Sequence, residues 1–401
     1  MKIILCVFGS VGDVRPTLAL GLALRNAGHE PIICAPPNFR DLFSQSEIPF
    51  YPIAFDSRKM MEEELKRFNN PVKFFSLLHK FQYDFTWGQF NDLLKVAGNG
   101  ADLIMATGLC IGSTVADYLK IPFRYYTSIP NFFISKYHVP VNLPFQRLPK
   151  SVNIVLWKLS RLAFKRFMGK DIGKIRELHK LRKGNYLNEE SILCEDPDLV
   201  RMPADVRQKY TQVGYWHLNE ETELDAGLAE FIEKGPAPIY IGFGSMTDHK
   251  PEKSQKILQQ LIDLHRYRFV ISKGWANLGV GVDDEDVYMV DHVPHLKLFP
   301  KMSMIIHHGG AGTVNTTARS GIPQIIVPHV LDQFYWGRRI YELKIGPKPI
   351  RRTSLTFKKL MDAIEEVSAN KDMQNNAKEL GAKLRKRDGI KEAVAIIEKI
   401  G

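Results

Sequence analysis

The strongest constraint on the fold of this 401-residue chain is a repeated order of short apolar runs, glycine-containing turns and helical segments. Residues 3–8 have the length and apolar character of a buried strand, the GSVGD segment that follows predicts a turn, and residues 16–27 predict a helix that Gly28 ends. The same order recurs at 103–107 and 114–119. Strands that alternate with crossover helices form parallel sheets, so the first half predicts a doubly wound α/β domain.

This order stops near Val213, and five further strand candidates follow an acidic stretch. They are residues 239–243, 269–272, 287–290, 304–307 and 324–328. The sequence therefore predicts an α/β protein with two Rossmann-like domains that face each other across a cleft. The expected segments are an N-terminal domain at 1–215, a linker at 216–236, a C-terminal domain at 237–385 and a C-terminal helix at 386–401 that packs back on the N-terminal domain. Ligands of such sheets bind at the carboxyl ends of the strands, so we expect the functional site in the cleft.

The net charge of +11 favours anionic partners, namely nucleic acid, acidic lipid headgroups or phosphorylated small molecules. Nucleic acid is disfavoured because no reading element or basic face with interleaved aromatic residues stands out. The four cysteines form no CxxC pair and no apolar stretch is long enough to cross a bilayer, which predicts a cytoplasmic protein. The apolar run at 3–8 is broken by Gly9 and Gly12, which favours a strand over a signal peptide.

Residues 147–183 contain a basic amphipathic segment. One helical face carries the apolar residues Val152, Val155, Leu156, Leu159, Leu162, Ala163 and Phe167. The basic residues Lys158, Arg161, Lys165 and Arg166 lie largely off that face. The interpretation that we favour is a helix packed on the protein's own core with a solvated basic edge. The alternative is peripheral contact of this segment with an anionic membrane.

The most informative segment is IIHHGGAGTVNTTARSGIP at 305–323. A strand ends at His307, and Gly310 and Gly312 let backbone N–H groups approach a ligand before a helix begins. The helix dipole favours a diphosphate, and His308 and Thr313 add donors, so no divalent metal is required. Simple tight packing of the glycine turn remains the alternative.

Two other classes of site are disfavoured. GSVGDV and GFGSMT lack the GxGxxG pattern of dinucleotide-binding proteins. The acidic run at 283–286 contains a DxD, which we interpret as a solvated loop rather than a metal site. His307 and His308 point to opposite faces of a strand and have no spaced ligand partner, so we predict no metal site.

The HHGGAGT segment, followed by GIPQ and PHVLDQ, resembles the donor-binding signature of nucleotide-sugar-dependent glycosyltransferases that modify small lipophilic molecules. The N-terminal FGSVGDVRPTLAL, IYIGFGSM and SKGW segments are most similar to the branch of sterol 3β-glucosyltransferases and of macrolide and glycopeptide antibiotic enzymes. The resemblance leaves residues 50–199, the acceptor region of such enzymes, unassigned.

The resemblance implies a GT-B fold, with the nucleotide sugar mainly on the C-terminal domain and the acceptor mainly on the N-terminal domain. Trp275 would stack on the nucleobase, Val293 would bind it through the backbone, and Asp332 and Gln333 would bind sugar hydroxyls. The complete donor site implied in this way consists of Ser10, Gly12, Gly244, Ser245, Trp275, Val293, His308, Gly310, Gly312, Thr313, Asp332 and Gln333.

Asp13 in the GDVRP turn occupies the position of the catalytic base in this branch. It would accept the proton of an acceptor hydroxyl as that oxygen attacks the anomeric carbon, which requires desolvation because a free aspartate is a weak base. The alternative role is a cap on the helix beginning near Pro16, and the two roles are compatible. Two positions depart from related enzymes: Thr316 replaces a ribose-binding glutamate of the plant signature, and Val11 stands where sterol enzymes usually have arginine.

We therefore expect an inverting O-glycosyltransferase, a hexosyltransferase that moves glucose from UDP-glucose to a hydroxyl of a sterol, polyketide or other lipophilic molecule, without a metal or other cofactor. A TDP-sugar-dependent natural-product enzyme and a non-catalytic nucleotide-sugar-binding partner subunit are the alternatives. Candidate walls of the acceptor pocket are the aromatic residues Phe85, Trp87, Phe132 and Phe133, for which ordinary core positions are the alternative.

Overall fold

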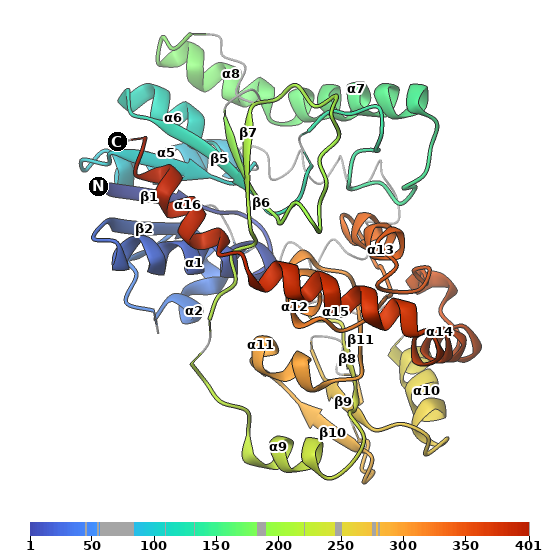
Figure 1. Cartoon of the computed structure of the whole chain (residues 1–401). Coiled ribbons are helices and arrows are strands. Elements are labelled where there is room, and N and C mark those ends of the chain that lie inside the picture. Colours follow the sequence, from blue (N-terminus) through green and yellow to red (C-terminus); the bar gives the residue numbers. More distant parts are fainter. Residues whose placement is uncertain are drawn as a thin grey trace.

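The computed structural model describes residues 1–44, 46–53, 56, 84–108, 110–131, 133–182, 190–219, 221–244, 251–274, 278–279 and 281–400. These residues form two α/β domains, each with a parallel sheet, that face each other (Figure 1). The predicted fold class is confirmed. None of the helices in these ranges is both long enough and apolar enough to cross a membrane.

The N-terminal sheet has seven strands in the order β3-β2-β1-β4-β5-β6-β7, all of them parallel. Its strands are β1 (Lys2–Cys6), β2 (Glu30–Ala35), β3 (Phe50–Pro52), β4 (Leu103–Ala106), β5 (Phe123–Thr127), β6 (Ser191–Cys194) and β7 (Tyr210–Val213). The helices of this domain are α1 (Val11–Asn26), α2 (Arg40–Ser44), α5 (Gln89–Ala97), α6 (Gly112–Leu119), α7 (Lys150–Phe167) and α8 (Gly169–Leu178), with short turns of helix at η1 (Pro37–Phe39) and η2 (Asp84–Gly88).

Strand β1 is buried on both faces because helices cover both sides of the sheet. Ile3 and Leu5 belong to one core, whereas Ile4 and Cys6 belong to the core on the opposite face. This alternation explains why the strand reads as a continuous apolar run in the sequence.

The C-terminal sheet has five parallel strands in the order β10-β9-β8-β11-β12. They are β8 (Ile239–Gly242), β9 (Phe269–Ser272), β10 (Val287–Val290), β11 (Met304–His307) and β12 (Gln324–Ile326), which agree with the five predicted runs to within two residues. The helices are α9 (Ala226–Glu233), α10 (Pro251–Ile262), α11 (His295–Leu298), η3 (Phe299–Lys301), α12 (Ala311–Ser320), α13 (Gln333–Glu342), η4 (Arg352–Ser354), α14 (Phe357–Ala369), α15 (Lys371–Arg385) and α16 (Gly389–Ile397).

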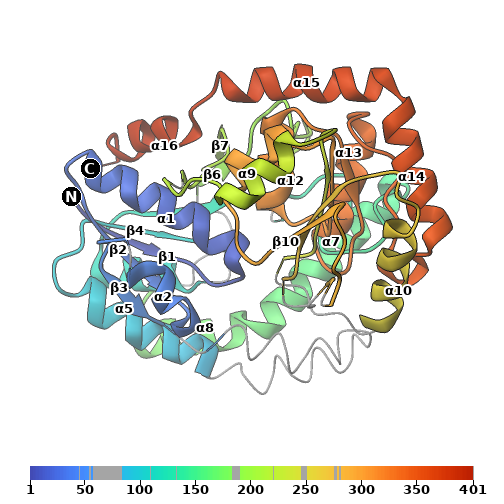
Figure 2. The same ribbon diagram turned by 90° about the horizontal axis from the view of Figure 1, so that it is seen from below.

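The last helix returns to the N-terminal domain. Helix α15 runs along the outside of the C-terminal domain, and α16 lies beside α1, with the two termini of the chain close together (Figures 1 and 2). Ala393 and Ile397 are fully buried in the same core as Ile3 and Leu5. The chain therefore passes between the domains twice, once after β7 and once before α16.

Helix α1 begins at Val11, five residues earlier than the start predicted near Pro16. Ser10 is its N-cap and Asp13 completes a capping box, so the second half of the GSVGD segment forms the first helical turn. The sequence prediction was wrong here because Pro16 is tolerated inside the helix.

Helix α7 contradicts the interpretation that its apolar face packs on the core. Val155, Leu159 and Leu162 are 54%, 55% and 63% exposed, whereas Asn153 and Trp157 are buried. The buried side of the helix is thus not the most apolar one. The reason lies in contacts with residues 136–138, which no periodicity within the helix reveals.

Candidate active site

The turn between β11 and α12 carries several of the residues predicted to bind the donor. His307 is fully buried, its Nδ1 accepts a hydrogen bond from the Gly309 backbone N–H (3.1 Å), and its Nε2 lies 3.0 Å from Gln324 Oε1. This pattern assigns the proton to Nε2. Burial lowers the pKa of His307 to about 4, so the ring is neutral at physiological pH. His307 therefore shapes the turn and does not act on a ligand.

His308 lies between two glycine turns. A Cβ atom on Gly310 would lie 2.5 Å from His308 Nε2, and one on Gly244 would lie 3.3 Å from Cε1, so glycine at these positions leaves room for the imidazole. Burial, together with the neighbouring His307, His329 and His295, holds the pKa of His308 well below its usual value. The imidazole is therefore a neutral hydrogen-bonding group rather than a cation.

The N-terminus of α12 completes the cradle. Gly310 is the N-cap, and no side chain caps the helix at this end. The first backbone N–H groups of a helix have no partner within it and carry partial positive charge, which suits a diphosphate. A Cβ atom on Gly312 would lie 3.3 Å from the hydroxyl of Tyr215, so this turn also meets the segment that joins the domains.

Asp332 and Gln333 lie at the start of α13, on the same side of the cleft. Asp332 Oδ2 accepts a hydrogen bond from Trp336 Nε1 (3.1 Å). Burial, and then the negative charge of Asp13, raise the pKa of Asp332 to about 7. Gln333 is buried, and its Oε1 accepts hydrogen bonds from the backbone N–H groups of His329 (2.8 Å) and Val330 (3.1 Å). Gln333 thus holds the loop that presents Asp332, and its contact with a sugar stays a prediction.

Asp13 occupies the opposite wall of the cleft, in the first turn of α1. Its Oδ2 accepts hydrogen bonds from the Ser10 backbone N–H (2.8 Å) and the Ser10 hydroxyl (3.0 Å), while the Gly12 N–H donates to Ser10 Oγ (3.2 Å). Burial raises the pKa of Asp13 above its ordinary value, although the hydrogen bonds from Ser10 lower it. The capping role is therefore present in the structure, and a carboxylate with a raised pKa is a better general base than a free aspartate.

A pocket lies beside Asp13, at the carboxyl ends of β1, β4, β5 and β6. Its lining combines apolar and hydrogen-bonding groups, as an acceptor with a reactive hydroxyl requires. The residues around it are Phe8, Asp13, Pro16, Thr107, Gly108, Tyr126, Thr127, Ser128, Ile129, Asn131 and Cys194. The loops after β4 and β5, which supply much of this lining, show no local motif in the sequence.

Three of the aromatic residues expected in the acceptor pocket, Phe85, Trp87 and Phe133, do not line this pocket. Phe85 stands behind it, with its ring edge-to-face on Phe8 (centroids 4.7 Å apart). Phe133 is buried against Tyr210, and Trp87 packs at the margin of a core cluster. These three belong to the core because their neighbours in the fold are apolar.

The remaining predicted site residues divide into two groups. Val293 is buried in the core between β10 and α11, and Thr313 lies in the first turn of α12. Ser245, Trp275 and Phe132 lie outside the described residues.

Sequence reasoning missed Glu195, which follows β6 and contacts the other domain. Its side chain is fully buried, and Oε1 accepts a hydrogen bond from Asn315 Nδ2 on α12 (3.0 Å). Within the described part of the chain, Oε2 has no hydrogen-bond partner. Burial raises the pKa of Glu195 well above its ordinary value; the bond from Asn315 opposes this, and the charges of Asp196 and Asp332 add to it. The sequence signal that could have indicated Glu195 is its position, in a Glu-Asp pair directly after the apolar run of β6.

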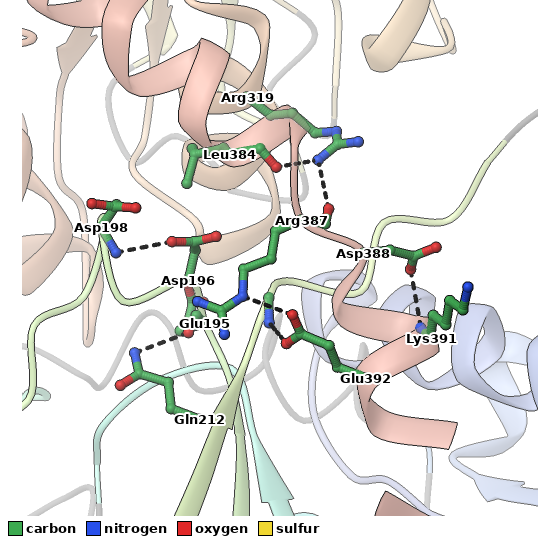
Figure 3. Close-up of polar contacts among 11 residues, drawn as sticks. Glu195, Asp196, Asp198, Gln212, Arg319, Leu384, Arg387, Asp388, Lys391 and Glu392 are labelled. Atoms are coloured by element: carbon green, nitrogen blue, oxygen red, sulfur yellow. Dashed lines mark hydrogen bonds and ion pairs between the residues drawn. The ribbon is translucent and has the colours of Figure 1, made fainter. Parts of the chain in front are cut away.

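Polar contacts connect this region to the two passages between the domains (Figure 3). Glu392 accepts hydrogen bonds from Arg387 Nε (2.8 Å) and from the Gly214 N–H (3.2 Å), so it joins the two connecting segments. Arg319 at the end of α12 donates to the carbonyl of Leu384 (2.7 Å). Helix α12 is thus linked at its C-terminal end to the connection between the domains.

The acidic run at 283–286 lies away from the cradle. Asp284 and Asp286 meet His265, with ligand atoms within 4.8 Å of one another. They precede β10, whereas the glycine cradle follows the carboxyl end of β11. The cluster is therefore not placed to hold a diphosphate on that cradle.

Comparisons with known proteins agree with this geometry. Residues 3–130 match the profile of the glycosyltransferase family 28 N-terminal domain, and residues 270–400 match that of the erythromycin biosynthesis protein CIII-like C-terminal domain. Glycosyltransferase GtfE of Amycolatopsis orientalis is 31% identical over 359 residues, which cover 86% of this chain and 85% of that protein. A sterol 3-beta-glucosyltransferase of Arabidopsis thaliana is 30% identical over 98% of this chain, which spans 64% of that protein.

Solved structures show the same fold. The calicheamicin glycosyltransferase superposes with a TM-score of 0.75 at 16% identity, covering 100% of this chain and 98% of that one. The glycosyltransferase SnogD from Streptomyces nogalater superposes with a TM-score of 0.70 at 19% identity, covering 100% of both chains. With two facing domains, a glycine cradle and this similarity to GtfE, the chain belongs to the GT-B glycosyltransferase family that includes glycosyltransferases of sterols and natural products.

Proposed function

We propose that this protein is an inverting O-glycosyltransferase that transfers glucose from UDP-glucose to a hydroxyl group of a lipophilic small molecule such as a sterol or polyketide. The observation that carries the proposal is the position of Asp13. It lines the pocket on the N-terminal domain, and its charge acts on Asp332, which lies beside the cradle on the C-terminal domain. Asp13 thus lines the proposed acceptor pocket and is electrostatically coupled to Asp332, a proposed sugar-binding residue.

The proposed step is a single displacement. The acceptor oxygen attacks the anomeric carbon, its proton passes to the Asp13 carboxylate, and the bond between that carbon and the diphosphate oxygen breaks. The N–H groups at the start of α12 and the neutral His308 stabilise the charge that develops on the leaving diphosphate. Attack from the face opposite the diphosphate inverts the anomeric carbon. These donors are provided by the chain itself, so the proposed reaction uses no metal.

Two parts of the proposal concern the surroundings of the reaction. All four cysteines are free and buried, which supports a location of the protein in the reducing cytoplasm. Peripheral membrane contact through residues 147–183 would bring a lipid acceptor close to the N-terminal domain, and the exposed leucines of α7 support it.

A TDP-sugar is the second candidate donor. Thr316 replaces the glutamate that would hold a ribose, so the nucleotide contacts of plant relatives do not transfer to this chain. Structural neighbours include glycosyltransferase VinC in complex with dTDP, at 19% identity. The donor experiment therefore includes both nucleotides.

The test is calorimetric titration of the protein with UDP, TDP, UDP-glucose and TDP-glucose in the presence of a chelator. We expect binding of UDP and UDP-glucose, a loss of at least tenfold in affinity for His308→Ala, and no loss for the exposed control His265→Ala. Asp13→Asn should bind the donor normally and release or transfer no glucose. Absence of binding by all four compounds, with or without magnesium, would refute the proposed function, and exclusive binding of TDP would replace the donor.

A further inference from the structure

Helix α7 carries an apolar face that points away from the protein. Val152, Val155, Leu159 and Leu162 are separated by three, four and three positions, which places them on one side of the helix. Their side chains are exposed to solvent, from 39% at Val152 to 63% at Leu162. In Figure 1 the helix lies along the outer edge of the N-terminal domain. A contiguous exposed apolar strip on a folded domain is typical of an interaction site.

The orientation of α7 is fixed by polar anchors on its inner side. Asn153 Nδ2 donates to the Lys136 carbonyl (2.9 Å), and Trp157 Nε1 donates to the His138 carbonyl (3.0 Å). The Trp157 ring also packs edge-to-face on His138, with centroids 5.5 Å apart. Rotation of the apolar strip toward the core would break both hydrogen bonds and leave buried polar groups without partners. The outward strip is therefore part of the folded structure.

The lysine and arginine side chains of the segment that contains the strip are not balanced by acidic residues of the same segment. Residues 136–170 contain no aspartate or glutamate. The basic residues in this range are Lys136, Arg147, Lys150, Lys158, Arg161, Lys165, Arg166 and Lys170. Lys158, Arg161, Lys165 and Arg166 are exposed on α7 itself. We define the α7 surface as the four apolar residues of the strip together with these four basic residues.

An anionic membrane surface matches both features best. An apolar strip beside cationic side chains fits the boundary between the headgroups and acyl chains of an anionic bilayer, where long basic side chains reach the phosphates. A second copy of the same surface would bring four cations of each chain together, which disfavours a symmetric dimer. An acidic protein is the remaining alternative.

The α7 surface and the pocket lie on the same domain. Ile129 and Asn131 line the pocket, and the segment that follows reaches α7 at Lys150 after packing on it through Lys136 and His138. A membrane bound at α7 would thus lie next to the domain that holds the pocket.

We propose that the α7 surface docks the protein on membranes that contain anionic lipid, with Val152, Val155, Leu159 and Leu162 entering the interface. Docking places the acceptor pocket beside the lipid phase, so that a membrane-dissolved acceptor reaches Asp13 without crossing water. The docking itself stands on the structure of α7, whereas delivery of an acceptor rests on the proposed function.

Vesicle flotation tests the docking. The full-length protein is mixed with vesicles of phosphatidylcholine alone or of phosphatidylcholine with phosphatidylglycerol, at low and high salt. We expect binding to the anionic vesicles at low salt, a steep loss of binding at high salt, and little binding to phosphatidylcholine. Leu159→Ser combined with Leu162→Ser should reduce binding more than tenfold, as should Lys158→Gln combined with Arg161→Gln. The controls Leu264→Ser and Lys358→Gln change exposed residues of the same types on the other domain and should bind as the wild type does.

The same samples are titrated with UDP. Normal UDP binding without vesicle binding would overturn the docking and leave the proposed function intact. Vesicle binding without UDP binding would support the docking and overturn the proposed function. Equal vesicle binding by wild type and both α7 double variants would also overturn the docking, because another surface would then be responsible. The docking would also be overturned if the wild type self-associates without binding vesicles and the leucine variant is monomeric. The α7 surface would then be an interface between copies of the chain.

Discussion

Replacement of Asp332 by asparagine is expected to stabilise the folded protein at neutral and alkaline pH. Burial and the charge of Asp13 raise the pKa of Asp332 from 3.8 to about 7 in the folded state. Ionising Asp332 is therefore harder in the folded protein than in the unfolded chain. Below about pH 4 the residue is protonated in both states and has no such cost. The cost grows as the pH rises from 3.8 toward 7 and is constant above that.

The size of the effect follows from the two pKa values. A difference of one pKa unit corresponds to about 1.4 kcal/mol, so the interval from 3.8 to about 7 gives an upper limit of about 4 kcal/mol. Asparagine removes this cost while its side-chain oxygen still accepts the hydrogen bond from Trp336 Nε1. The free energy of unfolding of Asp332→Asn should thus exceed that of the wild type by up to about 4 kcal/mol at pH 8, and by much less at pH 5.

Urea unfolding followed by tryptophan fluorescence between about pH 5 and pH 8 measures this difference. Asp291→Asn is the matched control, because the Asp291 side chain is 77% exposed and should show no such pH dependence. The reasoning would be refuted by a difference between Asp332→Asn and wild type that is the same at both ends of the range. Asp332→Asn should also lower the rate of sugar transfer if the residue binds sugar hydroxyls, which separates stability from function.

Three further outcomes are expected. Asp13→Asn should lower the pKa of Asp332, because it removes a neighbouring negative charge. The free energy of unfolding of Asp13→Asn should therefore level off at a lower pH than that of the wild type; identical profiles would exclude the coupling of the two residues. Gly310→Ala should weaken UDP binding at least tenfold in calorimetry because its Cβ would clash with His308, whereas Gly173→Ala, with open space around it, should not. Glu195→Ala should lower stability by about 1–3 kcal/mol in thermal unfolding because Asn315 Nδ2 loses one of its two acceptors and keeps only the Ala311 carbonyl, and Glu195→Gln should restore it; equal stability of Glu195→Ala and wild type would contradict this role.

The structure reconciles the two predicted roles of Asp13. The capping box uses Oδ2, and the same carboxylate lines the acceptor pocket. Capping fixes the position of the side chain relative to the pocket, which a general base requires. The position that stabilises the helix is therefore also the position that would serve catalysis.

The sequence predicted the strands of the C-terminal sheet accurately. The runs at 269–272, 287–290 and 304–307 coincide with β9, β10 and β11, because strands of a doubly covered parallel sheet must be apolar throughout. The glycines at 309, 310 and 312 could be recognised as a tight turn from the sequence. Where the backbone lies against a ligand or a side chain, there is no room for a Cβ atom. Both signals arise from the residues themselves and their immediate neighbours.

The acceptor side was not predictable in the same way. The pocket collects residues from the ends of four strands and from the loop after β5, which are up to 186 positions apart between Phe8 and Cys194. The loops carry no shared pattern, so the prediction of pocket walls was based on aromatic residues. Two of these, Phe85 and Phe133, are buried in the core. Pocket composition depends on which strand ends lie together, and the strand order sets that.

The sequence by itself determined two α/β domains, the glycine cradle and the amphipathic character of α7, since periodicity and steric demands act over a few residues. Only the tertiary structure decided which face of α7 is buried, because Asn153 and Trp157 find their partners in residues 136–138. It also decided that Glu195 is buried against Asn315, 120 positions away and in the other domain. Both outcomes depend on free energies of burial and hydrogen bonding that exist only when distant segments have come together.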